Sequence, residues 1–151
     1  MKVLLQRVSR AAVRVDGAVV GSIGRGLCVF LGVERGDTPA DADWNAAKTA
    51  ELRIFPDDLG KMNRSVEEIR GAVLVVSQFT LASSTKRGRR PSLEAAAPPE
   101  QALELYDRFV AALRERGLTA ATGTFRAMME VELVNDGPVT ILLDPREVPS
   151  P

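Results

Sequence analysis

Residues 133–143 read LVNDGPVTILL, in which Asn135, Asp136, Gly137 and Pro138 separate two apolar runs. The runs predict two strands, and Asp-Gly is a common two-residue turn of β-hairpins. Pro138 stands where the second strand should begin, although it has no N–H for a strand ladder and its ring fixes φ. The residues fit either a turn that the proline stiffens or a loop with a special role. Since only about 5–6% of X-Pro bonds are cis, the pair does not by itself predict a cis peptide.

Strands are predicted before, between and after two helices. Asp16-Gly17 between short apolar runs is typical of a hairpin. Leu27 to Val33 is a candidate central strand, and Val73 to Thr80 is a second apolar run, rich in β-branched residues. The last two predicted strands are Phe125 to Val134 and Val139 to Leu143.

Proline-containing segments at 38–39 (Thr-Pro) and 98–100 (Pro-Pro-Glu) are typical of helix starts. The second helix has apolar residues at i, i+3, i+4 and i+7 spacing, which predicts a buried face, and Gly117 as its stop. The buried stripe expected in the first helix includes Trp44, Ala47 and Leu52. The face expected in the second comprises Leu103, Tyr106, Phe109, Val110 and Leu113.

This order of elements predicts an α+β fold, with a largely antiparallel β-sheet and two packed helices. The pattern leaves open whether the sheet closes into a barrel. A chain of 151 residues and 16.3 kDa fits one domain. We place that domain at residues 1–145 and expect residues 146–151 to form a flexible tail.

Composition narrows the chemistry. With 45% apolar residues but no run of about 18 of them, the chain is expected to be soluble and to have no membrane partner. The single cysteine, Cys28, lies in an apolar run, which indicates burial and an intracellular protein without internal disulfides. The absence of histidine removes Ser-His-Asp and Cys-His catalysis and the common zinc sites. Backbone groups, hydroxyls, an amide or the substrate must therefore carry any reaction, and we expect no metal and no cofactor.

Polar side chains end the predicted strand VLVVSQFTL at 73–81. Alternation puts Ser77 and Phe79 on one face and Gln78 and Thr80 on the other. A buried strand that ends this way either reaches solvent or delivers hydroxyl and amide groups to a pocket.

A basic cluster stands out because the net charge is zero, with 20 basic and 20 acidic residues. It is either a solvated loop tip or a site for a polyanion. Its members are Lys86, Arg87, Arg89 and Arg90.

Several short segments, taken in chain order, match one family. They are QRV at 6–8, GSIGRGLCVFLGV at 21–33, RIFPDDLGKMN at 53–63, SQFTL at 77–81, KRGRRPS at 86–92, LYDRFV at 105–110 and NDGPVT at 135–140. From Met1 to about Leu143 the chain resembles the D-aminoacyl-tRNA deacylases, and SQFTL and NDGPVT are signature motifs of that family.

The resemblance implies a cytoplasmic, homodimeric editing hydrolase that needs no metal. Such an enzyme cleaves the ester at the 3′ end of D-aminoacyl-tRNA, and of glycyl-tRNA mischarged on alanine tRNA, while it spares L-aminoacyl-tRNA. The resemblance further implies that the Gly137-Pro138 peptide is cis and enters the pocket of the partner subunit, which SQFTL lines. An L side chain would meet this rigid backbone, whereas a D side chain would point away. The substrates that the resemblance implies are aminoacyl-tRNAs, and no DNA partner is expected.

The resemblance also suggests roles for single residues. Backbone N–H groups around Phe79 and Thr80 would stabilise the oxyanion, where one donor can be worth roughly 2.7–4 kcal/mol. The 2′-hydroxyl of the terminal adenosine would position or activate the water. The alternative, Thr80 as nucleophile, lacks a histidine base. Arg7 would brace the Gly137-Pro138 loop, although on its own it also fits an arginine that covers apolar surface.

The chain departs from the family pattern at two positions. Arg126 stands where many relatives carry glycine, and Leu93 stands where phenylalanine is more familiar. The resemblance also implies a ligand for the basic cluster, namely the phosphates of the tRNA acceptor stem. Two other functions remain open: a non-catalytic, dimeric RNA-binding module, and an esterase that acts on small esters.

Overall fold

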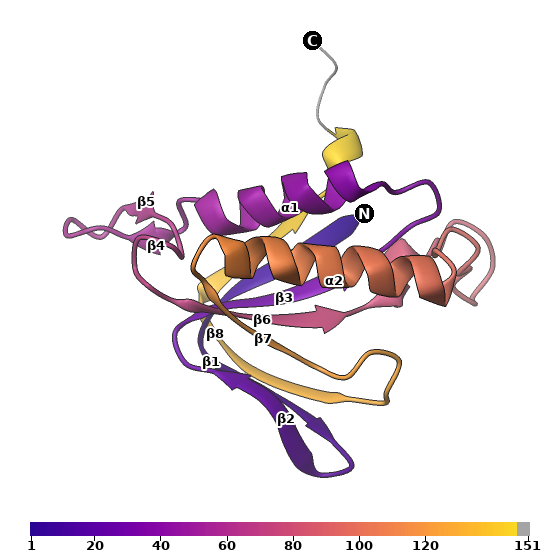
Figure 1. Cartoon of the computed structure of the whole chain (residues 1–151), viewed down its shortest axis with the longest axis horizontal. Coiled ribbons are helices and arrows are strands. Elements are labelled where there is room, and N and C mark those ends of the chain that lie inside the picture. The colour runs from indigo at the N-terminus through magenta and orange to yellow at the C-terminus, as the bar shows by residue number, and fades with distance from the viewer. Residues whose placement is uncertain (148–151) are drawn as a thin grey trace.

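Two helices lie side by side over one face of a strongly curved sheet (Figure 1). The computed structural model describes residues 1–147. The six strands of the sheet are β1 (Lys2–Val15), β2 (Ala18–Ile23), β3 (Gly26–Gly32), β6 (Ala72–Ser77), β7 (Thr119–Thr122) and β8 (Glu130–Leu143). The helices are α1 (Pro39–Glu51) and α2 (Pro99–Glu115), with short 3-10 helices η1 (Phe79–Ala82) and η2 (Pro145–Glu147). A separate small hairpin consists of β4 (Phe55–Pro56) and β5 (Met62–Arg64).

The first two strands form the predicted hairpin. β1 and β2 pair antiparallel across Asp16 and Gly17, whose φ angles of 49° and 81° are both positive. Two positive φ angles in a two-residue loop are typical of a type I′ turn, whose twist matches that of the strands it joins. The hairpin prediction is therefore confirmed.

Parallel pairing corrects the predicted, largely antiparallel sheet. The strand order is β2-β1-β3-β6-β7, with β8 also paired to β1. The pairs that involve β1 are antiparallel, but β3–β6 and β6–β7 are parallel. The connections explain the difference, because α1 lies between β3 and β6 and α2 between β6 and β7. Each helix carries the chain from the end of one strand back to the level where that strand began. The next strand therefore runs parallel to it. The sheet is mixed.

The last strand also differs from its prediction. β8 runs as one strand from Glu130 to Leu143, straight through the residues expected to separate two strands, and pairs with β1 on both sides of them. It does not begin at Phe125, because Arg126 lies in a turn with a φ of 65°. The residues between β7 and β8 are therefore a loop.

The two outer strands approach each other closely enough for the sheet to be nearly closed and barrel-like. Gly21 of β2 lies against Thr122 of β7, and a Cβ atom on Gly21 would be 2.3 Å from the Thr122 carbonyl oxygen. A side chain at position 21 would hold the two edges apart.

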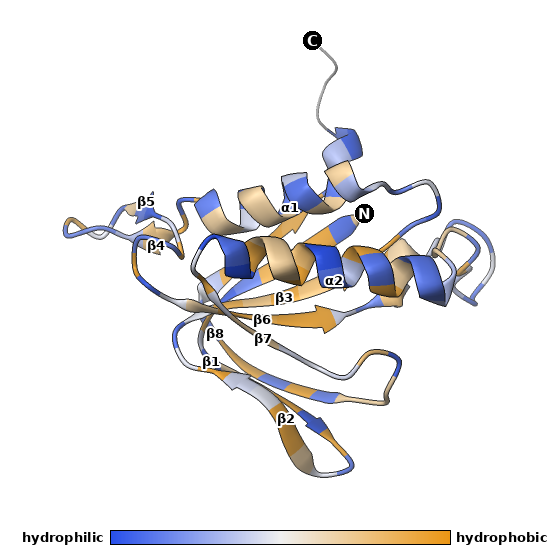
Figure 2. Ribbon diagram, viewed as in Figure 1, coloured by the Kyte–Doolittle hydropathy of each residue, from blue (hydrophilic) through white to orange (hydrophobic). Residues whose placement is uncertain are grey.

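The curved sheet has apolar residues on both of its faces (Figure 2). The larger cluster lies between the sheet and the helices and includes Phe109 and Leu113, which are fully buried. A smaller cluster lies inside the curl of the sheet, around Val13, Cys28 and Leu74. Burial of each large apolar side chain contributes about 1.5–3 kcal/mol, so these contacts dock α2 on the sheet.

The helix starts and the end of α2 match the predictions, but α1 ends at Glu51, before Leu52 of its predicted stripe, and the buried faces match only in part. Leu103 of α2 is 39% exposed, whereas the other four residues of its predicted face are buried. Trp44 and Ala47 of α1, and Leu52 directly after it, are only partly buried. The fully buried positions of α1 carry small side chains where the helix packs on its neighbours, namely Ala42, Asn45, Ala46, Thr49 and Ala50.

After β8 the described chain continues through η2. Arg146 in η2 pairs with Glu34 and with Asp144. Residues 148–151 of the expected tail lie outside the described residues, and the flexibility of residues 146–151 stays a prediction. Within residues 1–147, no helix is both long and apolar enough to cross a membrane.

Candidate active site

A wide bulge in β8 carries the Gly137-Pro138 peptide, which is cis. The ladder between β1 and β8 continues on both sides of the bulge, but across it Arg7 alone faces residues 136–139. Since these residues lack partners on β1, they loop out of the sheet. A proline is tolerated here because its missing N–H has no ladder partner to lose.

Arg7 ties this bulge to the rest of the domain. Its Nε donates a hydrogen bond to the carbonyl of Asp136 (2.7 Å) and lies 3.8 Å from the Asp136 carboxylate. Its Nη1 donates to the carbonyl of Ile54 (2.7 Å), in the segment that follows α1. Hydrogen bonds from a charged donor are stronger than neutral ones. The contact expected between Arg7 and the backbone of this loop is present.

Asn135 closes the bulge and was not among the predicted site residues. Its Oδ1 accepts a hydrogen bond from the N–H of Val139 (2.8 Å), and its Nδ2 donates to the Val139 carbonyl (3.2 Å) and the Thr140 hydroxyl (3.1 Å). The side-chain amide thus replaces the backbone partners that β1 does not offer. The sequence signal that could have indicated this role is the general tendency of asparagine side chains to hydrogen-bond to nearby backbone in turns.

No side chain fits at Gly137 without a shift of its neighbours. Its φ is 154°, and a Cβ atom would lie 2.7 Å from the backbone nitrogen and 2.8 Å from Cγ2 of Val139. The same atom would lie 3.4 Å from Nη2 of Arg7. The surface of the bulge at this position is therefore backbone.

The residues of SQFTL lie where β6 ends. The strand stops at Ser77 and η1 begins at Phe79, so the strand is shorter than predicted. Ser77 and Phe79 line a pocket of about 330 Å³, whereas Gln78 and Thr80 do not, and Gln78 Nε2 instead donates to the Thr80 hydroxyl. The predicted separation of the four side chains onto two sides is present. Other residues of this pocket, called here the β6-end pocket, include Ala96, Ala97, Phe125, Arg126 and Met129.

Two backbone N–H groups at the start of η1 belong to Phe79, which lines the β6-end pocket, and to Thr80, which follows it. A helix leaves its first N–H groups without intrahelical acceptors, and no hydrogen bond within residues 1–147 engages the N–H of Phe79 or Thr80. The N–H of Gln78 donates to the Leu31 carbonyl (2.8 Å), which fixes the turn against β3. Gly32 permits this approach because a Cβ there would lie 2.9 Å from the Gln78 carbonyl oxygen.

The bulge and the β6-end pocket of one chain lie apart. Arg7 pairs with Leu27 of β3, whereas Ser77 pairs with Leu31 at the other end of that strand. Four residues of strand span about 13 Å, and β3 itself stands between β1 and β6. Accordingly, residues 136–139 do not line the pocket.

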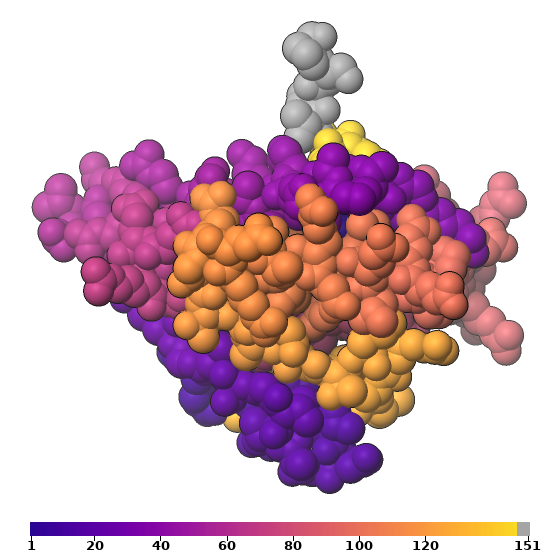
Figure 3. Space-filling model, in the orientation of Figure 1, coloured from indigo at the N-terminus to yellow at the C-terminus, as the bar shows by residue number. Residues whose placement is uncertain are grey.

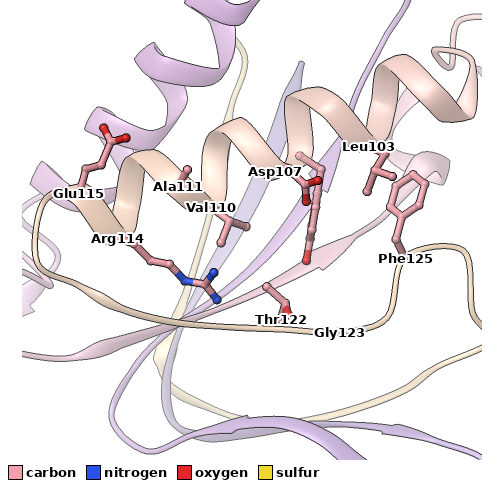
Figure 4. A pocket seen from close by; sticks show the side chains of 10 residues that line it. Leu103, Asp107, Val110, Ala111, Arg114, Glu115, Thr122, Gly123 and Phe125 are labelled. Atoms are coloured by element: carbon pink, nitrogen blue, oxygen red, sulfur yellow. The ribbon is translucent and has the colours of Figure 1, made fainter.

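A larger groove of about 560 Å³ separates α2 from the β7 side of the sheet (Figure 4). None of the predicted catalytic residues lines it. The hydroxyl of Tyr106 donates to the Val75 carbonyl (2.7 Å), and burial raises the pKa of Tyr106 to about 12. This hydrogen bond helps to dock α2 on β6. The charged residues of the groove are Asp107, Arg114 and Glu115.

Cys28 is buried, as predicted. Burial raises the pKa of its thiol to about 12. Since the thiolate is the nucleophilic form, a thiol with this pKa is inert near neutral pH.

The basic cluster projects from the wall of the β6-end pocket. Its loop protrudes at the right of Figure 3, and its base is closed by paired backbone hydrogen bonds between Ser84 and Ser92 (2.9 Å each). η1 leads into the loop, and Ala96 and Ala97 of the pocket follow it. The exposed cations are Lys86, Arg87, Arg89 and Arg90.

The chain is similar in sequence to proteins of one kind along almost its whole length. The family model described as D-Tyr-tRNA(Tyr) deacylase matches residues 4–144. A protein of Geobacter sulfurreducens called D-aminoacyl-tRNA deacylase is 61% identical over 144 residues, with 95% of each chain covered. A protein of the same name from Anaeromyxobacter dehalogenans is 60% identical over 148 residues, with 98% of this chain and 99% of that protein covered.

Solved structures share the fold. One described as c-Myc DNA Unwinding Element Binding Protein matches with a TM-score of 0.90 at 41% identity, over 95% of this chain and 98% of that one. Another, described as a probable eukaryotic D-amino acid tRNA deacylase, matches with a TM-score of 0.81 at 20% identity, over 94% and 97%. At 20% identity the likeness concerns the fold alone.

The match to the family model takes in both signature segments, together with the Arg7-braced bulge and the β6-end pocket that they form. With relatives that are 61% and 60% identical over at least 95% of its length, the chain belongs to the D-aminoacyl-tRNA deacylase family.

Proposed function

We propose that this protein hydrolyses the ester of D-aminoacyl-tRNA, and of glycyl-tRNA mischarged on alanine tRNA, and that it spares L-aminoacyl-tRNA. The observation that carries the proposal is a pair of features in one chain of this family: an Arg7-braced Gly137-Pro138 loop and free N–H groups beside a pocket at Phe79. The activity belongs to the cytoplasm, where aminoacyl-tRNA is made.

Catalysis rests on the backbone of η1. When water attacks an aminoacyl ester, negative charge develops on the carbonyl oxygen, and the N–H groups of Phe79 and Thr80 are free to donate to it. The Gln78 contact to Leu31 holds these donors in place before the substrate arrives, so little reorganisation is needed.

The attacking water is positioned by the substrate itself. The 2′-hydroxyl of the terminal adenosine is adjacent to the ester, and the chain has no histidine to act as a base. Thr80 is the weaker candidate for a nucleophile because its hydroxyl already accepts a hydrogen bond from Gln78 and has no general base beside it.

Chiral selection works by exclusion across a homodimer. The bulge at residues 136–139 of one subunit enters the β6-end pocket of its partner. The separation of about 13 Å along β3 between the two features of one chain supports this arrangement. Arg7 and Asn135 hold the bulge rigid, so an L side chain meets backbone that does not yield, whereas a D side chain or a hydrogen points away.

The basic loop holds the tRNA. Its four cations extend from the wall of the β6-end pocket, at the place where the acceptor stem would continue from a bound 3′ end. Reversal of charge at Arg89 and Arg90 should weaken tRNA binding and reduce its salt dependence.

The test is the release of D-tyrosine from D-Tyr-tRNA and from the same tRNA that ends in 2′-deoxyadenosine. The proposal expects rapid release from the first and slow release from the second. Equal release from both would overturn the role of the 2′-hydroxyl and favour Thr80, which a Thr80→Val variant then checks.

A non-catalytic RNA-binding module is the alternative that the projecting basic loop favours. It predicts salt-dependent tRNA binding without ester hydrolysis under any condition. An esterase for small esters would instead cleave free D-tyrosyl-adenosine as well as D-Tyr-tRNA.

A further inference from the structure

We propose that Arg126 binds the phosphate on the 5′ side of the terminal adenosine of tRNA, a contact that rests on the proposed function and deepens it. Arg126 lies in the loop between β7 and β8, at the same end of the sheet as the carboxyl end of β6 (Figure 1). It lines the β6-end pocket together with Ser77 and Phe79.

Arg126 is the charged member of an otherwise uncharged pocket. The other described residues that line the β6-end pocket are apolar, apart from Ser77. The Arg126 side chain is exposed, and within residues 1–147 no ion pair or hydrogen bond of its guanidinium group is found. Its charge is therefore available to a ligand.

The chemistry of the substrate places an anion at this rim. The ester is on the ribose of the terminal nucleoside, and its carbonyl must reach the N–H groups of Phe79 and Thr80. An apolar pocket that contains Phe79 and Phe125 suits the adenine base. The first charged group beyond that nucleoside is its 5′ phosphate, and a guanidinium group matches phosphate oxygens in a bidentate geometry.

The backbone makes Arg126 unusually easy to test. Its φ of 65° lies in the left-handed region, which glycine adopts at no steric cost. An Arg126→Gly variant therefore removes the charge without straining the fold, and its Tm should not fall below that of the unaltered protein.

Arg70 provides a matched control. It is also an exposed arginine in the left-handed region, with a φ of 54°. It precedes β6, whereas Ser77 ends that strand, so it lies at the far end from the pocket. Arg70→Gly thus loses the same charge and relieves the same kind of backbone strain elsewhere.

The experiment measures binding of a non-hydrolysable ligand, 3′-(D-tyrosylamino)-3′-deoxyadenosine, with and without a 5′ phosphate. The full-length unaltered protein should bind the phosphorylated ligand about tenfold more tightly. Arg126→Gly should bind both ligands equally, and Arg70→Gly should behave like the unaltered protein. For tRNA, the slope of log Kd against log salt should fall by about 0.7 in Arg126→Gly alone.

A phosphate preference that persists in Arg126→Gly, or that is absent from the unaltered protein, would overturn the inference. Hydrolysis of D-Tyr-tRNA is measured in parallel on the same proteins. If hydrolysis is absent while the phosphate preference depends on Arg126, the proposed function fails and the nucleotide contact stands.

Discussion

At Gly137 the shape of the bulge depends on the lack of a side chain. A Cβ atom would lie within 2.8 Å of two Val139 atoms, at a φ that L side chains rarely adopt. Gly137→Ala must therefore displace the peptide that we propose meets the substrate of the partner subunit. We expect a loss of about 100-fold in kcat/KM for D-Tyr-tRNA, or a comparable loss of preference for D over L, since small displacements of a positioning group can cost that much.

Gly36→Ala is the control for Gly137→Ala. Gly36 also has a positive φ, of 87°, but no atom lies within 4 Å of the position its Cβ would take. It should cost stability without changing the preference for D over L. If Gly137→Ala hydrolyses D-Tyr-tRNA at the normal rate and still spares L-Tyr-tRNA, the bulge is not the chiral filter.

A proline at position 79 would remove one proposed oxyanion donor. Phe79 is the first residue of η1, where proline is tolerated because its N–H has no helical partner. Phe79→Pro should lower kcat by about 10²–10³-fold, as measured by single-turnover hydrolysis of D-Tyr-tRNA. Phe79→Ala keeps the N–H and should lower kcat much less, so equal kcat values for the two variants would contradict the role of this group.

At the scale of single elements, a buried hydrogen bond adds to the apolar contacts that dock α2 on the sheet. Tyr106→Phe removes the hydrogen bond from its hydroxyl to the Val75 carbonyl (2.7 Å) and keeps the ring. The free energy of unfolding should fall by about 1 kcal/mol, measured by urea titration, with kcat little changed. A variant as stable as the unaltered protein would mean that this bond does not hold α2 in place.

The same tyrosine gives a pH-dependent signal, since it is the only tyrosine in the chain. Burial raises the pKa of Tyr106 to about 12 in the folded protein, against about 10 when unfolded. Stability from this group is therefore complete below about pH 10 and is lost as the pH rises toward 12. Absorbance at 295 nm should show phenolate near pH 12 in the native protein and near pH 10 in urea, and coincident titrations would contradict the burial of the hydroxyl.

Elements with strong local signals could be predicted from the sequence, and those set by distant pairing could not. Proline and glycine mark the start and end of α2, and the Asp16-Gly17 turn determines its own conformation. The turn residues in β8 predicted an interruption between two separate strands. In the structure, pairing with β1 on both sides of the bulge prevails over this local preference.

Some features of the candidate site could likewise be predicted from the sequence, and others could not. SQFTL, Gly137-Pro138 and Arg7 could be proposed from the family resemblance, and the hydrogen bond of Arg7 to the bulge could be anticipated. The closing role of Asn135 could not, because it requires knowing that Val139 has lost its partner on β1. The separation of the bulge from the pocket likewise depends on the register of strands far apart in the sequence.

For the whole molecule, a site shared between subunits predicts complementation. A mixed dimer would pair one Gly137→Ala subunit with one Phe79→Pro subunit. One of its two sites would then combine an unaltered pocket with an unaltered bulge, and purified mixed dimers should regain about half of the normal D-Tyr-tRNA hydrolysis. No regain, with both subunits folded, would mean that each chain completes its own site.

The central claim concerns chirality, so the most direct measurement compares the hydrolysis of D-Tyr-tRNA and L-Tyr-tRNA by the purified protein in EDTA. Rapid loss of the D ester with the L ester spared is the result that a metal-independent chiral editor predicts. Loss of neither ester, or of both at equal rates, would contradict the account.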